Sequence, residues 1–114
     1  MEMIREILNA AGVLFRRVKF PSPPPSTYAV YFDDVSGEGA DRVGTARSAG
    51  LPRIYHHNVR VELYEPTQDD KTEAAIEAEL DARGVEWTKE DRYWLQSEQR
   101  YQVLYEFSYT NKTR

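Results

Sequence analysis

The strongest structural signal in this chain is an alternation of bulky and more polar side chains between residues 101 and 109. One side of the alternation carries Tyr101, Val103, Tyr105, Phe107 and Tyr109. A period of two is typical of a β-strand, whose successive side chains point to opposite faces of a sheet. The aromatic side therefore predicts a buried sheet face on which a helix packs. A platform for stacking nucleic-acid bases would need basic neighbours, whereas Glu98 and Glu106 flank this stripe.

Other segments repeat this period. Residues 54–65 alternate cleanly, which predicts a strand with one buried and one exposed face. Residues 28–35 are apolar on both sides, which predicts an interior strand covered on both faces. Weaker strand patterns occupy residues 13–20 and the stretch from Val85 to Leu95, and three prolines in a row within residues 21–25 predict a stiff connector.

Two segments have the spacing of amphipathic helices. Residues 3–11 place Met3, Ile4, Ile7, Leu8 and Ala11 on one stripe, and Gly12 is suited to end that helix. The second helix is expected to begin with Asp70 as N-cap and Glu73 reaching back to it, and to end at Gly84.

Length and element order together predict the fold class. A chain of 114 residues is long enough for one core and too short for two, so a single domain spanning residues 1–114 is expected. Helices and hairpins segregated along the chain indicate an α+β fold. We expect an antiparallel or mixed sheet of about five to six strands, with two helices packed mainly on one face.

The polar, glycine-rich stretch at residues 36–52 predicts a long flexible loop that becomes ordered on a partner. Acidic residues spaced by four along the second predicted helix form a negative stripe, which is either a solvated face or a surface for a charged partner. The candidate interface residues are Gly37, Glu38, Asp41, Arg42 and Arg47 in the loop, and Glu73, Glu77 and Asp81 on the stripe.

Composition argues against several chemistries. The chain has no cysteine, and its net charge of −4 disfavours DNA binding as the main function. No membrane span or signal peptide is recognisable, so synthesis in the cytoplasm is expected. Adjacent His56 and His57 would point to opposite faces of a strand and could not share a metal ion. We expect no catalytic residue, cofactor or metal, and the alternative is a small enzyme that uses Asp33, Asp34 or His57.

Three stretches carry a family resemblance: Tyr28–Val35 (YAVYFDDV), Val61–Pro66 (VELYEP) and Tyr101–Phe107 (YQVLYEF). With them, the chain resembles small proteins that long-tailed phages and prophages encode among their head–tail connection genes. It is most similar to the tail-completion, or tail-terminator, group. These stretches are structural strings and contain no catalytic motif.

The resemblance implies a structural subunit, without cofactor or catalysis, that forms a ring oligomer, commonly a hexamer. Such a ring caps the finished tail tube and joins it to the head connector. The implied partners are further copies of the chain, the tail tube protein and a head–tail connector protein, with no membrane and no sequence-specific nucleic acid. The implied location is the virion. Two alternatives stay open: a head-completion adaptor or stopper on the connector side, and a small binding module or enzyme unrelated to phages.

Overall fold

The computed structural model describes residues 2–38 and 53–113. Five strands form one mixed sheet in the order β1-β2-β3-β5-β4, in which β1 runs parallel to β2 and all other neighbours are antiparallel. The elements in chain order are α1 (Met3–Ala11), β1 (Leu14–Arg17), β2 (Tyr28–Glu38), β3 (Arg53–Glu65), α2 (Asp70–Ala82), β4 (Trp87–Leu95) and β5 (Arg100–Thr113). The predicted α+β class is confirmed.

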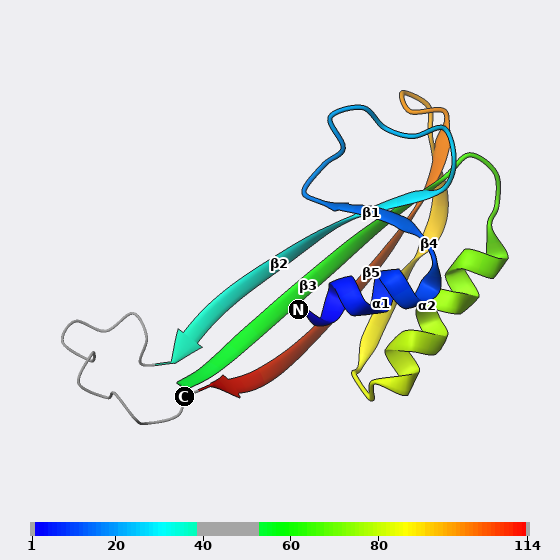
Figure 1. Ribbon diagram of the computed structural model, residues 1–114. Helices are drawn as coiled ribbons and strands as arrows, with labels where there is room; N and C mark the ends of the chain where they lie inside the picture. The colour runs from blue at the N-terminus through cyan, green and yellow to red at the C-terminus, as the bar shows by residue number, and fades with distance from the viewer. Residues whose placement is uncertain (1, 39–52, 114) are drawn as a thin grey trace.

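Both helices cover the same face of the sheet, as Figure 1 shows. The stripe of α1 buries Ile4, Ile7 and Leu8, and α2 contributes Ile76 and Leu80. The covered sheet face contributes Ala29, Tyr31, Val59, Val61, Leu63, Val103, Tyr105 and Phe107. The alternating stripe of β5 is therefore the core face, as its period predicts.

The start of α2 differs from the expectation. Asp69, and not Asp70, is the N-cap: its backbone is non-helical and its Oδ1 accepts a hydrogen bond from the Thr72 N–H at 3.0 Å. Thr27 donates a second hydrogen bond, at 2.7 Å, to the other oxygen of Asp69. Glu73 is thereby free to turn toward the sheet instead of reaching back. The predicted end is confirmed, because Gly84 follows the helix with a left-handed φ of +71°.

β2 differs from its prediction in its length and in how much of its second face is buried. It runs to Glu38, which pairs with Ile54, so residues 36–38 of the predicted loop belong to a strand. Its second face is covered only at one end, where Tyr28 and Val30 are buried and the proline-rich connector folds back over them. Phe20 meets the Tyr28 ring edge-on with centroids 5.1 Å apart, and Arg100 holds the connector by donating to the Pro24 carbonyl at 2.9 Å. Farther along the strand this second face is open.

Strand length explains the shape of the molecule. The thirteen residues of β3 span roughly 43 Å, whereas the thirteen residues of α2 span only about 20 Å. The ends of β2, β3 and β5 consequently run on beyond the helices, toward the grey trace in Figure 1. We call this three-stranded extension the distal ribbon, and it comprises residues 34–38, 53–58 and 108–113.

Candidate functional site

The acidic stripe of α2 is turned toward the sheet and holds the helix in place. Glu73 is buried and pairs with Lys89 of β4 at 2.9 Å and with Arg92. Glu77 also contacts Lys89, at 2.7 Å, and accepts a hydrogen bond from the hydroxyl of Tyr105 at 2.7 Å. Asp81 accepts one from the indole N–H of Trp87 at 2.8 Å. The expectation that Glu73 lies on a solvated or partner-facing surface is wrong, because lysine and arginine on β4 compensate the stripe from within the chain.

A buried pair of carboxyl groups, Glu65 and Glu73, lies beside these contacts between α2 and the sheet. Glu65 closes β3 and is fully buried, and its Oε1 accepts a hydrogen bond from Arg92 at 3.1 Å. Burial, reinforced by the neighbouring Glu73 carboxylate, raises the pKa of Glu65 to about 8. Burial also opposes ionisation of Glu73, but hydrogen bonds from Glu65, Lys89 and Arg92 hold its pKa below the usual range. The pair thus favours a neutral Glu65 beside an ionised Glu73.

Asp33 and His57 meet near the start of α1. The carboxylate of Asp33 lies 3.0 Å from Nδ1 of His57, and the imidazole stacks on the Tyr109 ring with centroids 4.3 Å apart. Nε2 of His57 lies 3.0 Å from Oδ1 of Asn111. Both ring nitrogens of His57 thus face side-chain oxygen atoms, so the imidazole links β2 and β5 across β3.

This Asp–His pair lacks a nucleophile in the described part of the chain, where no hydroxyl or amine side chain hydrogen-bonds to His57. Asp34 lies on the opposite face of the sheet and does not join the pair. His56 also lies on that opposite face, as the alternation of β3 predicts. Among the residues that the structure describes, no three side chains of metal-ligating type converge on one point. The side chains of Asp33 and His57 thus form a hydrogen-bonded link between β2 and β3 on the helix-covered face.

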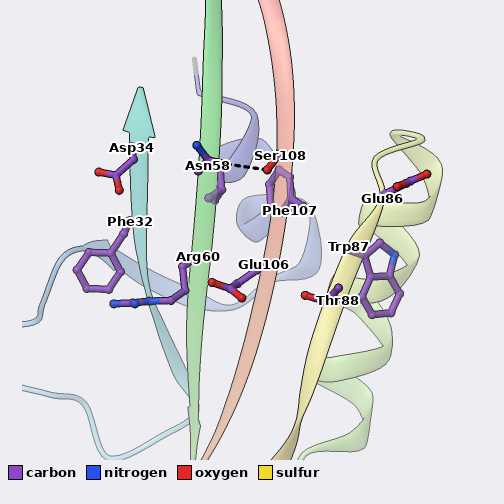
Figure 2. A pocket seen from close by; sticks show the side chains of 11 residues that line it. Phe32, Asp34, Asn58, Arg60, Glu86, Trp87, Thr88, Glu106, Phe107 and Ser108 are labelled. Carbon is purple, nitrogen blue, oxygen red and sulfur yellow. Dashed lines mark hydrogen bonds between the residues drawn. The ribbon is translucent and has the colours of Figure 1, made fainter. Parts of the chain in front are cut away.

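The open sheet face carries a shallow depression of about 650 Å³ between β2, β3, β5 and the start of β4. Figure 2 shows its residues: the Arg60 guanidinium lies over the Phe32 ring, 4.6 Å from its centroid, with Glu106 and Asp34 nearby. Ser108 donates to Asn58 at 2.8 Å, so its hydroxyl is already engaged. Aromatic side chains, one arginine and three carboxylates (Asp34, Glu86 and Glu106) on a wide, solvated surface suit contact with another protein better than capture of a small molecule.

The predicted loop residues fall in two groups. Gly37 and Glu38 are strand residues of the distal ribbon, paired with Tyr55 and Ile54. Asp41, Arg42 and Arg47 lie outside the described residues. Of the loop candidates, the two described ones therefore lie in the distal ribbon and not with the α2 stripe.

Sequence reasoning expected an exposed strand edge or a loop to meet a neighbouring copy, but it singled out neither the open face nor any residue of the outer strands. Arg60 and Phe32 belong to different strands, and nothing in the local pattern indicates that β2 and β3 place them side by side. The charge of each segment was a usable signal, because Arg16 and Arg17 are consecutive in one predicted strand, and Glu90 and Asp91 are consecutive in another. Only the strand order shows that the basic pair and the acidic pair lie on the two opposite edges of the sheet.

Comparison of the sequence with protein-family models and with curated proteins finds no match. Within residues 2–38 and 53–113, no helix is long and apolar enough to cross a membrane.

Proposed function

We propose that this chain is a structural subunit of a long-tailed phage or prophage particle, in which it completes the tail and joins it to the head. The observation that supports this proposal best is the distal ribbon. Three paired strands extend beyond the helices, and two of them, β2 and β3, lead directly into the segment of residues 39–52. A rigid arm of this kind can place a segment of chain against a neighbouring subunit while the helix-covered body stays intact.

The proposed particle contains a ring of copies, six according to the resemblance, which caps the tail tube. The tail tube protein lies on one side of the ring and a head–tail connector protein on the other. The open sheet face and the two outer strands provide each copy with surface for such contacts. The acidic net charge of −4 suits a ring through which DNA must pass without being gripped.

Disruption of the gene in the phage or prophage that encodes it tests the proposal. Electron microscopy is expected to show filled heads and separate tails, with joining restored when the gene is supplied from a plasmid. Because the proposed ring caps the tube, unjoined tails should also vary in length. Tails of uniform length would favour the adaptor or stopper on the connector side. Fully joined particles would refute a role in joining.

Purified protein gives a second test. Pull-down with assembled tail tubes and with connector rings from the same particle should recover the chain on the tubes. Recovery on the connector ring alone would again favour the head-side adaptor, and recovery on neither would argue against both.

A further inference from the structure

The two outer strands of the sheet, β1 and β4, expose apolar side chains. In the described part of the chain, the exposed large apolar residues are Leu14, Val18, Val35, Tyr93 and Trp94. Four of these five lie on or directly beside an outer strand, two at each edge. Leu14 is 55% exposed and Tyr93 is 46% exposed, and each edge carries a second exposed apolar side chain, Val18 or Trp94. Apolar side chains that gather on a surface are typical of contact with another protein.

The same two edges carry opposite charge. β1 contains Arg16 and Arg17 and no acidic residue, whereas β4 contains Glu90 and Asp91. The two basic residues of β4, Lys89 and Arg92, are committed to the carboxylates of α2 and Glu65. Arg16, Arg17, Glu90 and Asp91 are all exposed, and none of the four forms an ion pair with another described side chain.

The register of the sheet aligns these residues across the molecule. One cross-strand row on the open face begins at Leu14, passes through Tyr28, Tyr64 and Gln102, and ends at Tyr93. The next open-face row begins at Arg16 and ends at Glu90, with Val30, Glu62 and Leu104 between. When a second copy is placed beside the first at the same level, Leu14 faces Tyr93 and Arg16 faces Glu90. Each edge thus complements the other in both apolar character and charge.

We infer that the β1 edge of one copy docks against the β4 edge of the next, so that copies associate head to tail. This inference rests on the proposed ring-forming function and identifies its subunit contact. Because each copy offers two different edges, the contact is heterologous, and a closing rotation turns it into a ring.

Side chains, and not a continuous ladder of main-chain hydrogen bonds, provide the specificity of this contact. β1 has only four residues, and β4 is irregular between Glu90 and Tyr93. Short and irregular edges resist indiscriminate strand pairing. The hydroxyl of Tyr93 donates to Gln102, which holds the ring in position at the edge while leaving much of it exposed.

The absence of cysteine allows a direct test. In the double variant L14C/Y93C, the two thiols of one chain lie four strand spacings apart, roughly 19 Å, which is too far for an internal disulfide. Diamide, which takes up two electrons and two protons for each disulfide, is expected to link neighbouring copies into a ladder of multiples of 13.3 kDa on a non-reducing gel. The matched control L14C/K71C pairs the β1 edge with an exposed position on α2 and should stop at a small amount of dimer.

Charge reversal gives a second, independent readout. The variant R16E/R17E has two acidic edges and the variant E90K/D91K has two basic edges, so each alone should lose self-association in sedimentation velocity by at least about tenfold in dissociation constant. An equimolar mixture of the two should associate again, as should the chain carrying all four changes. The paired control K71E/E79K changes charge on α2, away from both edges and from the open face, and should behave as the unmodified chain.

The outcomes separate this inference from the proposed function. A ladder that is equally strong in L14C/K71C, or association that survives both single-edge reversals, overturns the edge contact. A monomeric chain with no ladder at millimolar concentration overturns it too. The gene disruption described above tests the role in the particle independently. The proposed role therefore remains if the edge contact is overturned, and the edge contact remains if the proposed role is refuted.

Discussion

Glu65 carries a carboxyl group in an environment far from that of an ordinary surface glutamate. Its Oε2 is buried and receives no hydrogen bond from the described residues. The groups that act on it are Glu73 from α2, Arg92 from β4 and Tyr105 from β5. Asp70 and Lys89 pair in turn with Arg92 and Glu73. A proton on Glu65 converts this unpaired acceptor into a donor to Glu73, which explains why burial and Glu73 raise its pKa.

Replacement of Glu65 by Gln should flatten the dependence of stability on pH. The folded-state pKa of Glu65, about 8, lies above its ordinary value of 4.5, so the folded chain binds this proton more tightly than the unfolded chain. The free energy of unfolding of the unmodified protein should therefore fall as pH rises through this interval. The Gln amide keeps a donor to Glu73 at every pH. Urea unfolding at pH 5, 6, 7 and 8 measures the two slopes.

The control for this measurement is Glu79→Gln, which removes a partly exposed carboxylate from α2. It should keep the slope of the unmodified protein. An unchanged slope in Glu65→Gln would mean that Glu65 is ionised across this interval and that another group is responsible.

Asp33 and His57 form a second residue-scale test. The side chain of Asp33 is 1% exposed and that of His57 is 12% exposed, so loss of either partner leaves the other poorly solvated. Asp33→Ala and His57→Ala should each lower the free energy of unfolding by about 3 kcal/mol. The double variant should lose less than the sum, by about 1–3 kcal/mol, because the two changes remove one interaction.

The adjacent Asp34→Ala is the matched control for this cycle. Asp34 is exposed on the other face of β2, so its removal should change stability by less than about 0.5 kcal/mol. Strict additivity of the Asp33 and His57 effects would show that the pair contributes no coupling energy.

At the scale of elements, two neighbouring aspartates have different roles: Asp69 caps α2, and Asp70 is an exposed charge in its first turn. Asp69→Ala should cost about 1 kcal/mol or somewhat more, because it removes the cap of α2 together with the hydrogen bond from Thr27. Asp70 is 84% exposed and contacts only Arg92, which retains Glu65 and Glu73, so Asp70→Ala should cost less than about 0.5 kcal/mol. Thermal unfolding of the two variants measures the difference, and equal costs would contradict the assignment of the cap.

The core elements could be predicted from sequence because their signals are local. Period-two alternation located β3 and β5, and the stripe from Met3 to Ala11 located α1 with its end at Gly12. The cap of α2 could not be decided, since Asp69 and Asp70 are chemically alike and the choice depends on Thr27, far away in the chain. The end of β2 was missed because Ser36 and Gly37 have weak strand preference, and pairing with His56 and Tyr55 overrides it.

The candidate site was harder to predict because it depends on strand order. The charged stripe of α2 has the pattern of an exposed surface, and only its contacts with Lys89 and Trp87 show that it faces β4. The row from Arg16 to Glu90 crosses five strands, and no spacing along the chain encodes it. Local periodicity predicts which face of each helix or strand is buried. Which distant elements contact each other depends on the packing of the whole chain, and local periodicity does not predict it.

At the scale of the whole molecule, the helices divide the sheet into two parts with different tasks. The part under α1 and α2 buries the core and accounts for stability. The distal ribbon lies beyond the helices, where it is held by strand pairing and by the Asp33–His57 pair at its base. Changes at the far end of the ribbon should therefore affect contacts with partners far more than they affect folding.

Replacement of residues 39–52 by a short linker containing Asn-Gly tests this division. The linker would close the β2–β3 hairpin next to the last described pair, Glu38 and Ile54. If the segment serves only for contacts with partners, its removal should leave the free energy of unfolding unchanged or raise it by about 1 kcal/mol through a smaller loop-closure cost. Head–tail joining, measured as the fraction of joined particles in electron micrographs, should be lost.

A variant that keeps the length and composition of residues 39–52 but scrambles their order is the matched control. It should fold equally well and also fail in joining, because a partner recognises side chains in a particular order and length alone does not suffice. Normal joining by the scrambled chain would mean that the segment acts as a spacer, with the ribbon strands making the contact. Loss of the cooperative unfolding transition in the shortened chain would place the segment in the folded core and remove the basis for assigning it to partners.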